Sequence, residues 1–253
     1  MDIVIVGSGN VAAVLGRKFK SAGHHILQVV SRNASAASAL AYEWDTESTN
    51  YRSLINKNAE VYIIAVPDDA IEEVVADLKL PKKVVAHTAA SVSKDILKNV
   101  SDHYGVFYPL QSLRKEMPGL PDTPLIVDGS DDKAKKTLEA LAHSIAQEQV
   151  EVTDDEKRRK LHIAAVMVSN FTNYLYMLAE EYCRKENIDF KSLLPLIEET
   201  AGRIKEISPT EVQTGPAVRN DIQTIQKHLA LLEKHPKMKK VYEFLSASIT
   251  GEK

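Results

Sequence analysis

A glycine-rich turn near the start of the chain constrains the fold more than any other feature. The apolar run Asp2–Val6 leads directly into Gly7-Ser8-Gly9-Asn10-Val11-Ala12, a G-x-G-x-x-A sequence that opens a helical pattern. The first glycine of such a turn permits a tight strand-to-helix connection, the second lets a pyrophosphate approach the backbone, and the alanine allows close helix–sheet packing. The helix amino terminus offers N–H groups and a positive dipole end to phosphates. The sequence therefore predicts that Gly7, Ser8, Gly9, Asn10, Val11 and Ala12 bind a dinucleotide.

Short Val- and Ile-rich runs alternate with helical patterns up to residue 152. The predicted strands are Asp2–Val6, Ile26–Ser31, Val61–Val66, Val84–His87, Gly105–Tyr108, Leu125–Val127 and Gln149–Val152. The predicted helices are Val11–Ala22, Ala34–Trp44, Asp69–Leu78, Ser93–Asn99 and Asp132–Ala146. Strands that lack polar alternation are typical of a parallel sheet covered on both faces. We expect a doubly wound, mostly parallel α/β Rossmann domain over residues 1–152.

Beyond Val152 the sequence contains only helical patterns. Thr153 and Glu156 have the spacing of a capping box, which predicts a long helix to about Glu186 with Asn187 as its stop. Further helices are predicted at Phe190–Ile207, Pro216–Lys234 and Lys237–Ser248, separated by proline-containing breaks. The carboxyl-terminal domain, residues 153–253, is therefore predicted to be all-α.

Composition limits the possible partners. The formal net charge of −3 gives no general affinity for nucleic acid or anionic membranes. The single cysteine, Cys183, excludes an intramolecular disulfide and a multi-cysteine metal site, so we predict no metal. The apolar stretch Ile163–Leu178 contains polar residues and is shorter than the roughly 20 residues of a membrane span. We expect a cytoplasmic protein with a small-molecule substrate and neither nucleic acid nor membrane as partner.

The end of the second predicted strand indicates which dinucleotide binds. An NAD-specific site usually has an acidic residue there for the ribose hydroxyls, whereas this chain has Ser31, Arg32 and Asn33. A guanidinium can pair with a 2′-phosphate and stack on adenine. These three residues are predicted to bind the adenosine ribose, and NADP(H) is preferred over NAD(H). The alternative is that Arg32 is a solvated surface charge.

Two further turns are expected at the carboxyl edge of the sheet, where ligands of open α/β sheets lie. Val66 and Pro67 follow one strand, and His87 and Thr88 follow the next. All four residues are predicted to contact the cofactor, because small polar groups after His87 suit a nicotinamide ribose and amide. The alternative for His87 is a hydrogen-bonded structural histidine at the strand end.

The turns Gly7–Ala12, Ser31–Asn33 and Ala65–Asp68 resemble those of the 6-phosphogluconate dehydrogenase-like superfamily, which includes pyrroline-5-carboxylate reductase and the β-hydroxyacid dehydrogenases. Nearly the whole chain is similar to a bacterial group of candidate NADP oxidoreductases that pairs a Rossmann-like domain with a helical domain of unknown function. The motifs that carry this closer resemblance are His87-Thr88-Ala89, Tyr108–Ser112, His162–Ala165, Ser169-Asn170-Phe171 and Thr214–Asp221. The resemblance implies a homodimer formed through the helical domain, and it implies no particular substrate.

The chain departs from the β-hydroxyacid dehydrogenases at one position. Those enzymes carry a catalytic lysine four residues before an asparagine on the first long helix. Counting back four residues from Asn170 gives Val166, which cannot transfer a proton. Hydroxyacid chemistry by the usual residues is therefore not expected.

Polar residues form a stripe on the predicted long helix. His162, Val166, Asn170 and Asn173 are spaced by four, four and three residues, which places them along one face. His162 is predicted to exchange the proton that accompanies hydride transfer, since its reference pKa lies near neutrality. Asn170 is predicted to act beside it in catalysis, and Asn173 in substrate binding. The alternative is that the stripe makes hydrogen bonds between helices or across a dimer interface.

The segment Thr214–Asp221 is a second candidate for substrate binding. Gly215 and Pro216 are predicted to open a helix, with Arg219 one turn in and able to pair with a substrate carboxylate or phosphate. The alternative is an ion pair between Arg219 and a neighbouring acid. The basic run Lys157-Arg158-Arg159-Lys160 is predicted to be a solvated helix face.

Together these features predict an NADP-dependent oxidoreductase. Hydride would pass between NADP(H) and a small, possibly anionic carbonyl or imine compound bound between the domains against His162, Asn170 and Arg219. The absent lysine keeps open a non-catalytic sensor that binds NADP(H) and reports its level. Reduction with a deazaflavin cofactor is a third interpretation.

Overall fold

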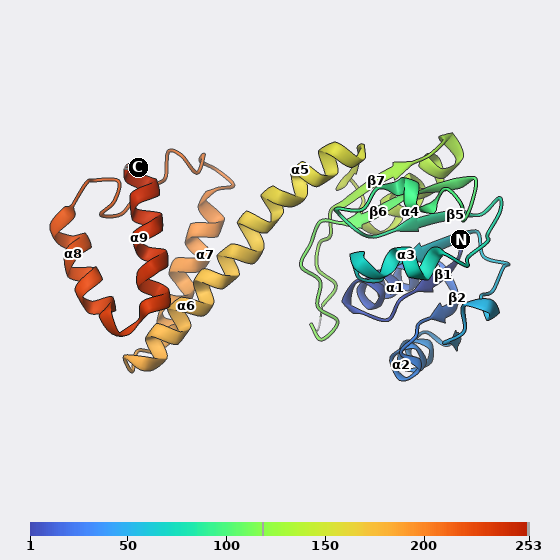
Figure 1. The fold of residues 1–253 in the computed structure, drawn as a ribbon, viewed down its shortest axis with the longest axis horizontal. Coiled ribbons are helices and arrows are strands. Elements are labelled where there is room, and N and C mark those ends of the chain that lie inside the picture. The colour runs from blue at the N-terminus through green and yellow to red at the C-terminus, as the bar shows by residue number, and fades with distance from the viewer. Residues whose placement is uncertain (118, 252–253) are drawn as a thin grey trace. The chain divides into compact units, whose positions relative to one another are not determined.

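The computed structural model describes residues 1–117 and 119–251, which form two compact units that divide between Val166 and Met167 (Figure 1). The predicted domain boundary at 152/153 marks the end of the last strand. The division between the two units lies farther along, because Arg158 of the next helix is buried against the first unit. Residues 252–253 of the predicted second domain lie outside the described residues. Within the described ranges, no helix is long and apolar enough to cross a membrane.

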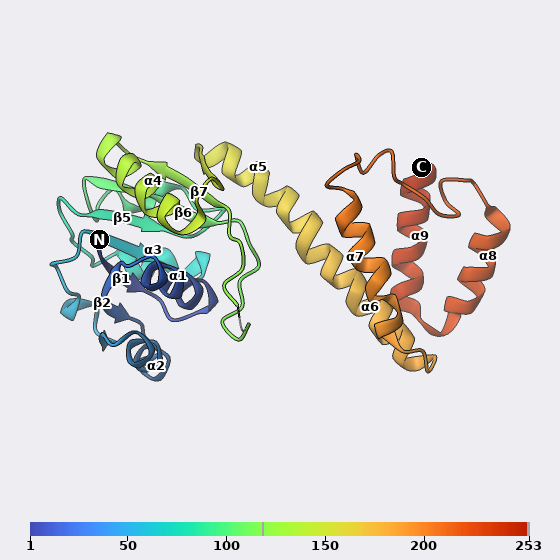
Figure 2. The same cartoon turned by 180° about the vertical axis from the view of Figure 1, so that it is seen from behind.

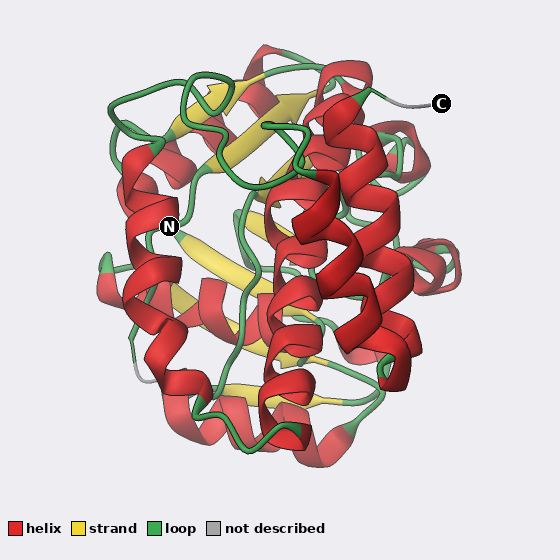
Figure 3. Cartoon of the chain, turned by 90° about the vertical axis from the view of Figure 1, so that its left-hand side faces the viewer, coloured by secondary structure: helices red, strands yellow, loops and turns green. Residues whose placement is uncertain are grey.

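The first unit is built on one eight-stranded sheet, drawn in yellow in Figure 3. Its strand order is β3-β2-β1-β4-β5-β6-β7-β8, and every pairing is parallel except β6 with β7. The strands are β1 Asp2–Val6, β2 His25–Val30, β3 Glu47–Thr49, β4 Val61–Ile64, β5 Val84–His87, β6 His103–Pro109, β7 Leu125–Gly129 and β8 Val150–Val152. The predicted mostly parallel α/β class is confirmed, and the short polar edge strand β3 is an addition to it.

Helices cover both faces of this sheet (Figure 2). They are α1 Asn10–Ser21, α2 Ala34–Trp44, α3 Ile71–Val75 and α4 Asp132–Ala146, whereas α5 Asp155–Ala165 follows β8 and extends away from the sheet. Alternate residues of β1 point to opposite faces, so Ile3 and Ile5 pack with α1, α2 and α4, whereas Val4 and Val6 pack with α3. Two apolar cores thus explain why β1 is a continuous apolar run.

Within its described residues the second unit contains helices and turns but no strand, as predicted. Its helices are α6 Thr172–Lys185, α7 Leu194–Arg203, α8 Ile222–Leu231 and α9 Pro236–Thr250. The predicted long helix is observed as α5, a π-helical turn over Val166–Phe171, and α6. Asn187, with a φ of 56°, ends it as expected, and the Ile188 N–H donates to the Cys183 carbonyl.

Two predicted helix starts are wrong. Helix α5 is capped by Asp154, whose side chain accepts from the Lys157 N–H, because the Thr153 N–H is still bonded to the sheet at Val127. Helix α8 begins at Ile222 with Asp221 as its cap, rather than at Pro216. Residues 216–221 form turns instead, so the anion-binding helix start predicted at Gly215-Pro216 does not exist.

The basic run on α5 is also not uniformly solvated. Arg158 is fully buried, whereas Lys157, Arg159 and Lys160 are exposed. The Arg158 guanidinium donates to the carbonyls of Ala90 (2.9 Å) and Val92 (2.6 Å) in the loop after β5. Its Nη2 also lies 2.8 Å from the Asp155 carboxylate. This buried arginine fixes α5 against the sheet unit.

Candidate functional site

The glycine-rich turn has the geometry that its sequence predicts. Gly7 has a φ of +127°, and a Cβ there would lie 2.1 Å from the Ala65 carbonyl oxygen, so only glycine fits. A Cβ at Gly9 would meet nothing within 4 Å, which leaves open space over the backbone. Ala12 is buried in the helix–sheet core, where it serves packing rather than ligand contact.

The amino terminus of α1 is free of side-chain caps. Gly9 occupies the cap position without a side-chain hydrogen bond, and the first turn contains no acidic residue. The first N–H groups of a helix lack intrahelical partners and attract anions. Gly9, Asn10 and Val11 line a cavity at this point, so the turn fits a pyrophosphate group.

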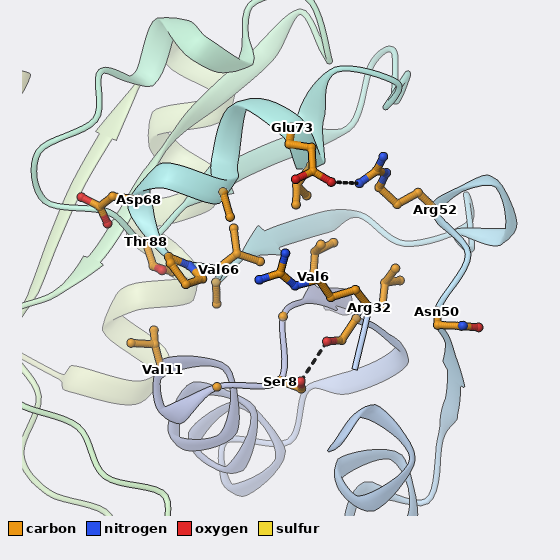
Figure 4. Close-up of a pocket in the computed structure, with 18 of the residues that line it drawn as sticks. Val6, Ser8, Val11, Arg32, Asn50, Arg52, Val66, Asp68, Glu73 and Thr88 are labelled. Carbon is orange, nitrogen blue, oxygen red and sulfur yellow. Dashed lines mark hydrogen bonds and ion pairs between the residues drawn. The ribbon is translucent and has the colours of Figure 1, made fainter. Parts of the chain in front are cut away.

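A cavity of about 900 Å³ lies at the carboxyl ends of β1, β2 and β4 (Figure 4). Its size falls in the range of small-molecule and cofactor sites. Most of the predicted cofactor-binding residues line it: Gly7, Ser8, Gly9, Asn10, Val11, Ser31, Arg32, Val66, Pro67 and Thr88. Four separate sequence motifs therefore meet in one cavity.

Besides the buried Ala12, two predicted cofactor residues lie outside the cavity. Asn33 caps α2, its side chain accepting from the Ala36 N–H at 3.0 Å. His87 is fully buried and does not line the cavity; its Nδ1 accepts from the Ala89 N–H (3.2 Å) and its Nε2 lies 3.3 Å from the Ser93 carbonyl. Burial lowers the pKa of His87 to about 4, so the ring is neutral at pH 7. This is the geometry of the structural alternative for His87.

Two arginines line the cavity. Arg32 is exposed and, in the described part of the chain, makes no ion pair or side-chain hydrogen bond, whereas Arg52 pairs with Glu73 and Asp77. Arg52 and its partners Glu73 and Asp77 were not predicted as site residues. The missed lining residues with polar side chains are Asn50, Tyr51, Arg52, Ser53, Asp68, Glu73 and Asp77. The sequence signal for Asn50–Ser53 is only a polar run after Thr49, in which apolar residues do not recur at helix or strand spacing.

A second cluster joins β6 to α5 within the first unit. The Tyr108 hydroxyl lies 3.0 Å from His162 Nδ1, and the two rings pack edge to face with centroids 5.9 Å apart. Burial, followed by the charge of Asp68, raises the pKa of Tyr108, so the phenol stays protonated at neutral pH. Asp68 also lines the cavity, which places this pair within electrostatic reach of the cavity wall. Tyr108 belonged to a quoted motif but was not predicted as a site residue.

The other residues predicted for catalysis and substrate binding, Asn170, Asn173 and Arg219, belong to the second unit, whereas His162 belongs to the first. Asn170 lies in the π-helical turn and Asn173 in the first turn of α6, and both side chains are exposed. Arg219 is exposed in the turn before α8 and contributes to lowering the pKa of Asp221, behind the larger effect of the Thr224 hydrogen bonds. The catalytic role of Asn170 and the substrate-binding roles of Asn173 and Arg219 stay predictions.

Two family models match the chain. Residues 2–91 match the model described as NADP oxidoreductase, coenzyme F420-dependent, and residues 123–249 match a domain of unknown function, DUF2520. No curated protein matches the chain significantly.

Solved structures share the whole fold. A candidate NADP oxidoreductase from Bacteroides fragilis is 35% identical, with a TM-score of 0.90, over 99% of this chain and 98% of that chain. An imine reductase from Myxococcus stipitatus in complex with NADP+ is 13% identical (TM-score 0.70; 98% and 93% covered). A 1-pyrroline-5-carboxylate reductase from Streptococcus pyogenes is 15% identical (TM-score 0.62; 99% and 98% covered). These matches confirm the predicted resemblance, the fold class and NADP as the cofactor.

The two glycines of the turn are expected to respond differently to alanine. Gly7→Ala should lower the free energy of unfolding by roughly 2–3 kcal/mol, because the new Cβ collides with backbone at a positive φ. Gly9→Ala should change it by less than about 1 kcal/mol and should instead weaken dinucleotide binding, since its Cβ enters the open cavity. Urea unfolding and cofactor titration measure the two effects. Equal destabilisation by both variants would contradict this division.

Buried His87 should make stability depend on pH. Its folded-state pKa of about 4 lies below the unfolded value of 6.5, so its stabilisation is complete above pH 6.5 and is lost as pH falls toward 4. The loss should reach about 3 kcal/mol and should be smaller in His87→Gln. Urea unfolding at several pH values measures this loss, with His25→Gln, at an 80% exposed side chain, as the control. An unchanged pH slope in His87→Gln would contradict the assignment.

Proposed function

Because this chain belongs to the family of NADP oxidoreductases that carry a DUF2520 domain, we propose that it catalyses hydride transfer between NADP(H) and a small carbonyl or imine compound. The observation that carries the proposal is the cavity that joins the uncapped start of α1 to the exposed cation Arg32. Bound NADPH would supply the hydride. The backbone of Gly7–Val11 would hold the pyrophosphate, and Val66, Pro67 and Thr88 would line the path toward the nicotinamide.

Arg32 is proposed to bind the 2′-phosphate. A guanidinium forms charge-assisted, bidentate hydrogen bonds to phosphate, and among the described residues Arg32 has no ion pair to give up when it forms them. No acidic residue stands at positions 31–33 to repel the phosphate. Ser31, held 2.9 Å from Ser8 Oγ, presents a hydroxyl beside it.

His162 is proposed to exchange the proton that reduction of a C=O or C=N bond requires. Tyr108 engages Nδ1, which leaves Nε2 as the ring atom for the substrate. A hydroxyl can donate to a neutral Nδ1 or accept from a protonated one, so Tyr108 can hold the ring in both states. Tyr108 is therefore a positioning residue in this scheme.

An imine or carbonyl substrate is favoured over a β-hydroxyacid. Val166 replaces the catalytic lysine of the β-hydroxyacid dehydrogenases, whereas structures of an imine reductase and a pyrroline-5-carboxylate reductase share this fold. Asn170 and Asn173 are proposed to bind substrate oxygens, and Arg219 an anionic group of the substrate. The match of residues 2–91 to a coenzyme F420-dependent model makes a deazaflavin a second hydride partner to assay.

The helical unit is proposed to form a homodimer in the cytoplasm. It exposes many large apolar side chains, among them Met167, Val168, Phe171, Met177, Leu196 and Phe244. Exposed apolar side chains in such number are typical of a protein interface, and a second copy of the chain would cover them. The lone, buried Cys183 is compatible with a reducing compartment.

His162 can be tested by turnover. In a panel of imines, carbonyl compounds and a deazaflavin assayed with NADPH, His162→Asn should lower kcat about 10²–10⁴-fold. The NADPH dissociation constant should be unchanged, since His162 lies outside the cofactor cavity. Tyr108→Phe should lower kcat less and shift the pH profile. Full activity of His162→Asn would remove its assigned role, and NADPH binding without any turnover would favour the sensor.

Arg32 can be tested by binding alone. Arg32→Ala should weaken NADPH binding about 10–100-fold, the loss of one or two charged hydrogen bonds, and should leave NADH binding nearly unchanged. Fluorescence titration with both cofactors measures the ratio. Equal losses for the two cofactors, or no loss, would speak against a phosphate contact.

A further inference from the structure

A second guanidinium reaches the adenosine end of the cavity from a different element. Arg52 begins the 3₁₀ turn Arg52–Leu54 after β3, and Glu73 and Asp77 lie on the α3 side. Arg52 Nη1 lies 3.4 Å from Glu73 Oε1, and Nη2 lies 3.6 Å from Asp77 Oδ2. Figure 4 shows the Arg52 side chain extending to Glu73 and the Arg32 side chain crossing the cavity toward Val66.

These ion pairs are weak enough to exchange. The Glu73 and Asp77 side chains are 69% and 79% exposed, and ion pairs this exposed contribute little to stability. A phosphate offers a guanidinium two parallel, charge-assisted hydrogen bonds, which are stronger than these long contacts. Arg52 therefore favours a phosphate over its present partners whenever one comes within reach.

The carboxylates of Glu73 and Asp77 make the positive charge of Arg52 necessary for phosphate binding at this end of the cavity. A dianionic phosphate brought near Glu73 and Asp77 would be repelled by both. Arg32 alone supplies one positive charge against these two negative charges on the cavity wall, whereas Arg32 and Arg52 together balance them. NADH carries no phosphate on the adenosine ribose, so its binding is much less sensitive to this balance.

We propose that Arg52 is a second determinant of cofactor specificity, which binds the 2′-phosphate of NADP(H) together with Arg32. Glu73 and Asp77 hold the guanidinium at the cavity wall when no phosphate is bound. The inference rests on the proposed function only in that NADP(H) occupies this cavity; it does not depend on the substrate or on His162.

The test compares dissociation constants for NADPH and NADH, measured by fluorescence titration at low salt. The variants are Arg52→Gln and the double variant Glu73→Gln/Asp77→Asn. Arg203→Gln is the matched control, because Arg203 also forms a partly exposed arginine–glutamate pair, with Glu199, but lies outside the cavity. Thermal unfolding of each variant without cofactor checks that the fold is retained.

Arg52→Gln should weaken NADPH binding about tenfold and NADH binding less than about twofold, and Arg203→Gln should change neither. The double variant should tighten NADPH binding severalfold, because a competitor for Arg52 and a source of repulsion are both removed. If Arg52→Gln weakened NADPH and NADH binding equally, Arg52 would act by adenine stacking or by supporting the cavity wall, and the proposal would be overturned. Unchanged NADPH binding in Arg52→Gln, or weaker NADPH binding in the double variant, would overturn it as well. If the wild-type chain bound neither cofactor, the proposed function itself would fail.

Discussion

The close approach of Gly7 to the Ala65 carbonyl is the contact on which the whole site depends. The backbone at residue 7 leaves no room for a Cβ, and its N–H donates to the Val30 carbonyl at 2.8 Å. The turn is thus fixed at the carboxyl ends of β1, β2 and β4 together. Helix α1 begins from this point, so its free N–H groups, Arg32 after β2 and Asp68 after β4 reach the same cavity.

The cavity is lined by both positive and negative groups, so anion binding depends on the groups that contact the anion directly. Backbone N–H groups of α1 and the guanidiniums of Arg32 and Arg52 face three carboxylates on the α3 side, Asp68, Glu73 and Asp77. The chain as a whole has a formal charge of −3, so long-range attraction does not bring anions to the site. Binding of a phosphorylated cofactor instead requires that each phosphate meet a cation or an N–H group at contact distance.

Local signals let the sequence predict a large part of this fold. The bounds of α2 and α4 were predicted to the residue, and the side chains of Asn33 and Asp131 cap their starts. Strand β3 was missed because three polar edge residues have no apolar period and are defined only by pairing with β2. The wall that carries Arg52 was missed with it. At Gly215-Pro216 the Gly-Pro signal competed with the later cap at Asp221, whose two bonds to Thr224 are decisive.

The basic run on α5 shows why contacts between residues far apart in the sequence could not be predicted from local patterns. It also shows how such a contact supports the site. Nothing within residues 157–160 indicates which of them meets the carbonyls of Ala90 and Val92, which lie far back in the sequence. Yet this buried anchor holds α5 on the sheet, and His162 follows Arg158 by one helical turn on the same side of the helix. The Tyr108–His162 hydrogen bond is therefore supported from the sheet unit alone. The His162 ring is thus positioned by contacts within the first unit, the same unit that contains the cavity.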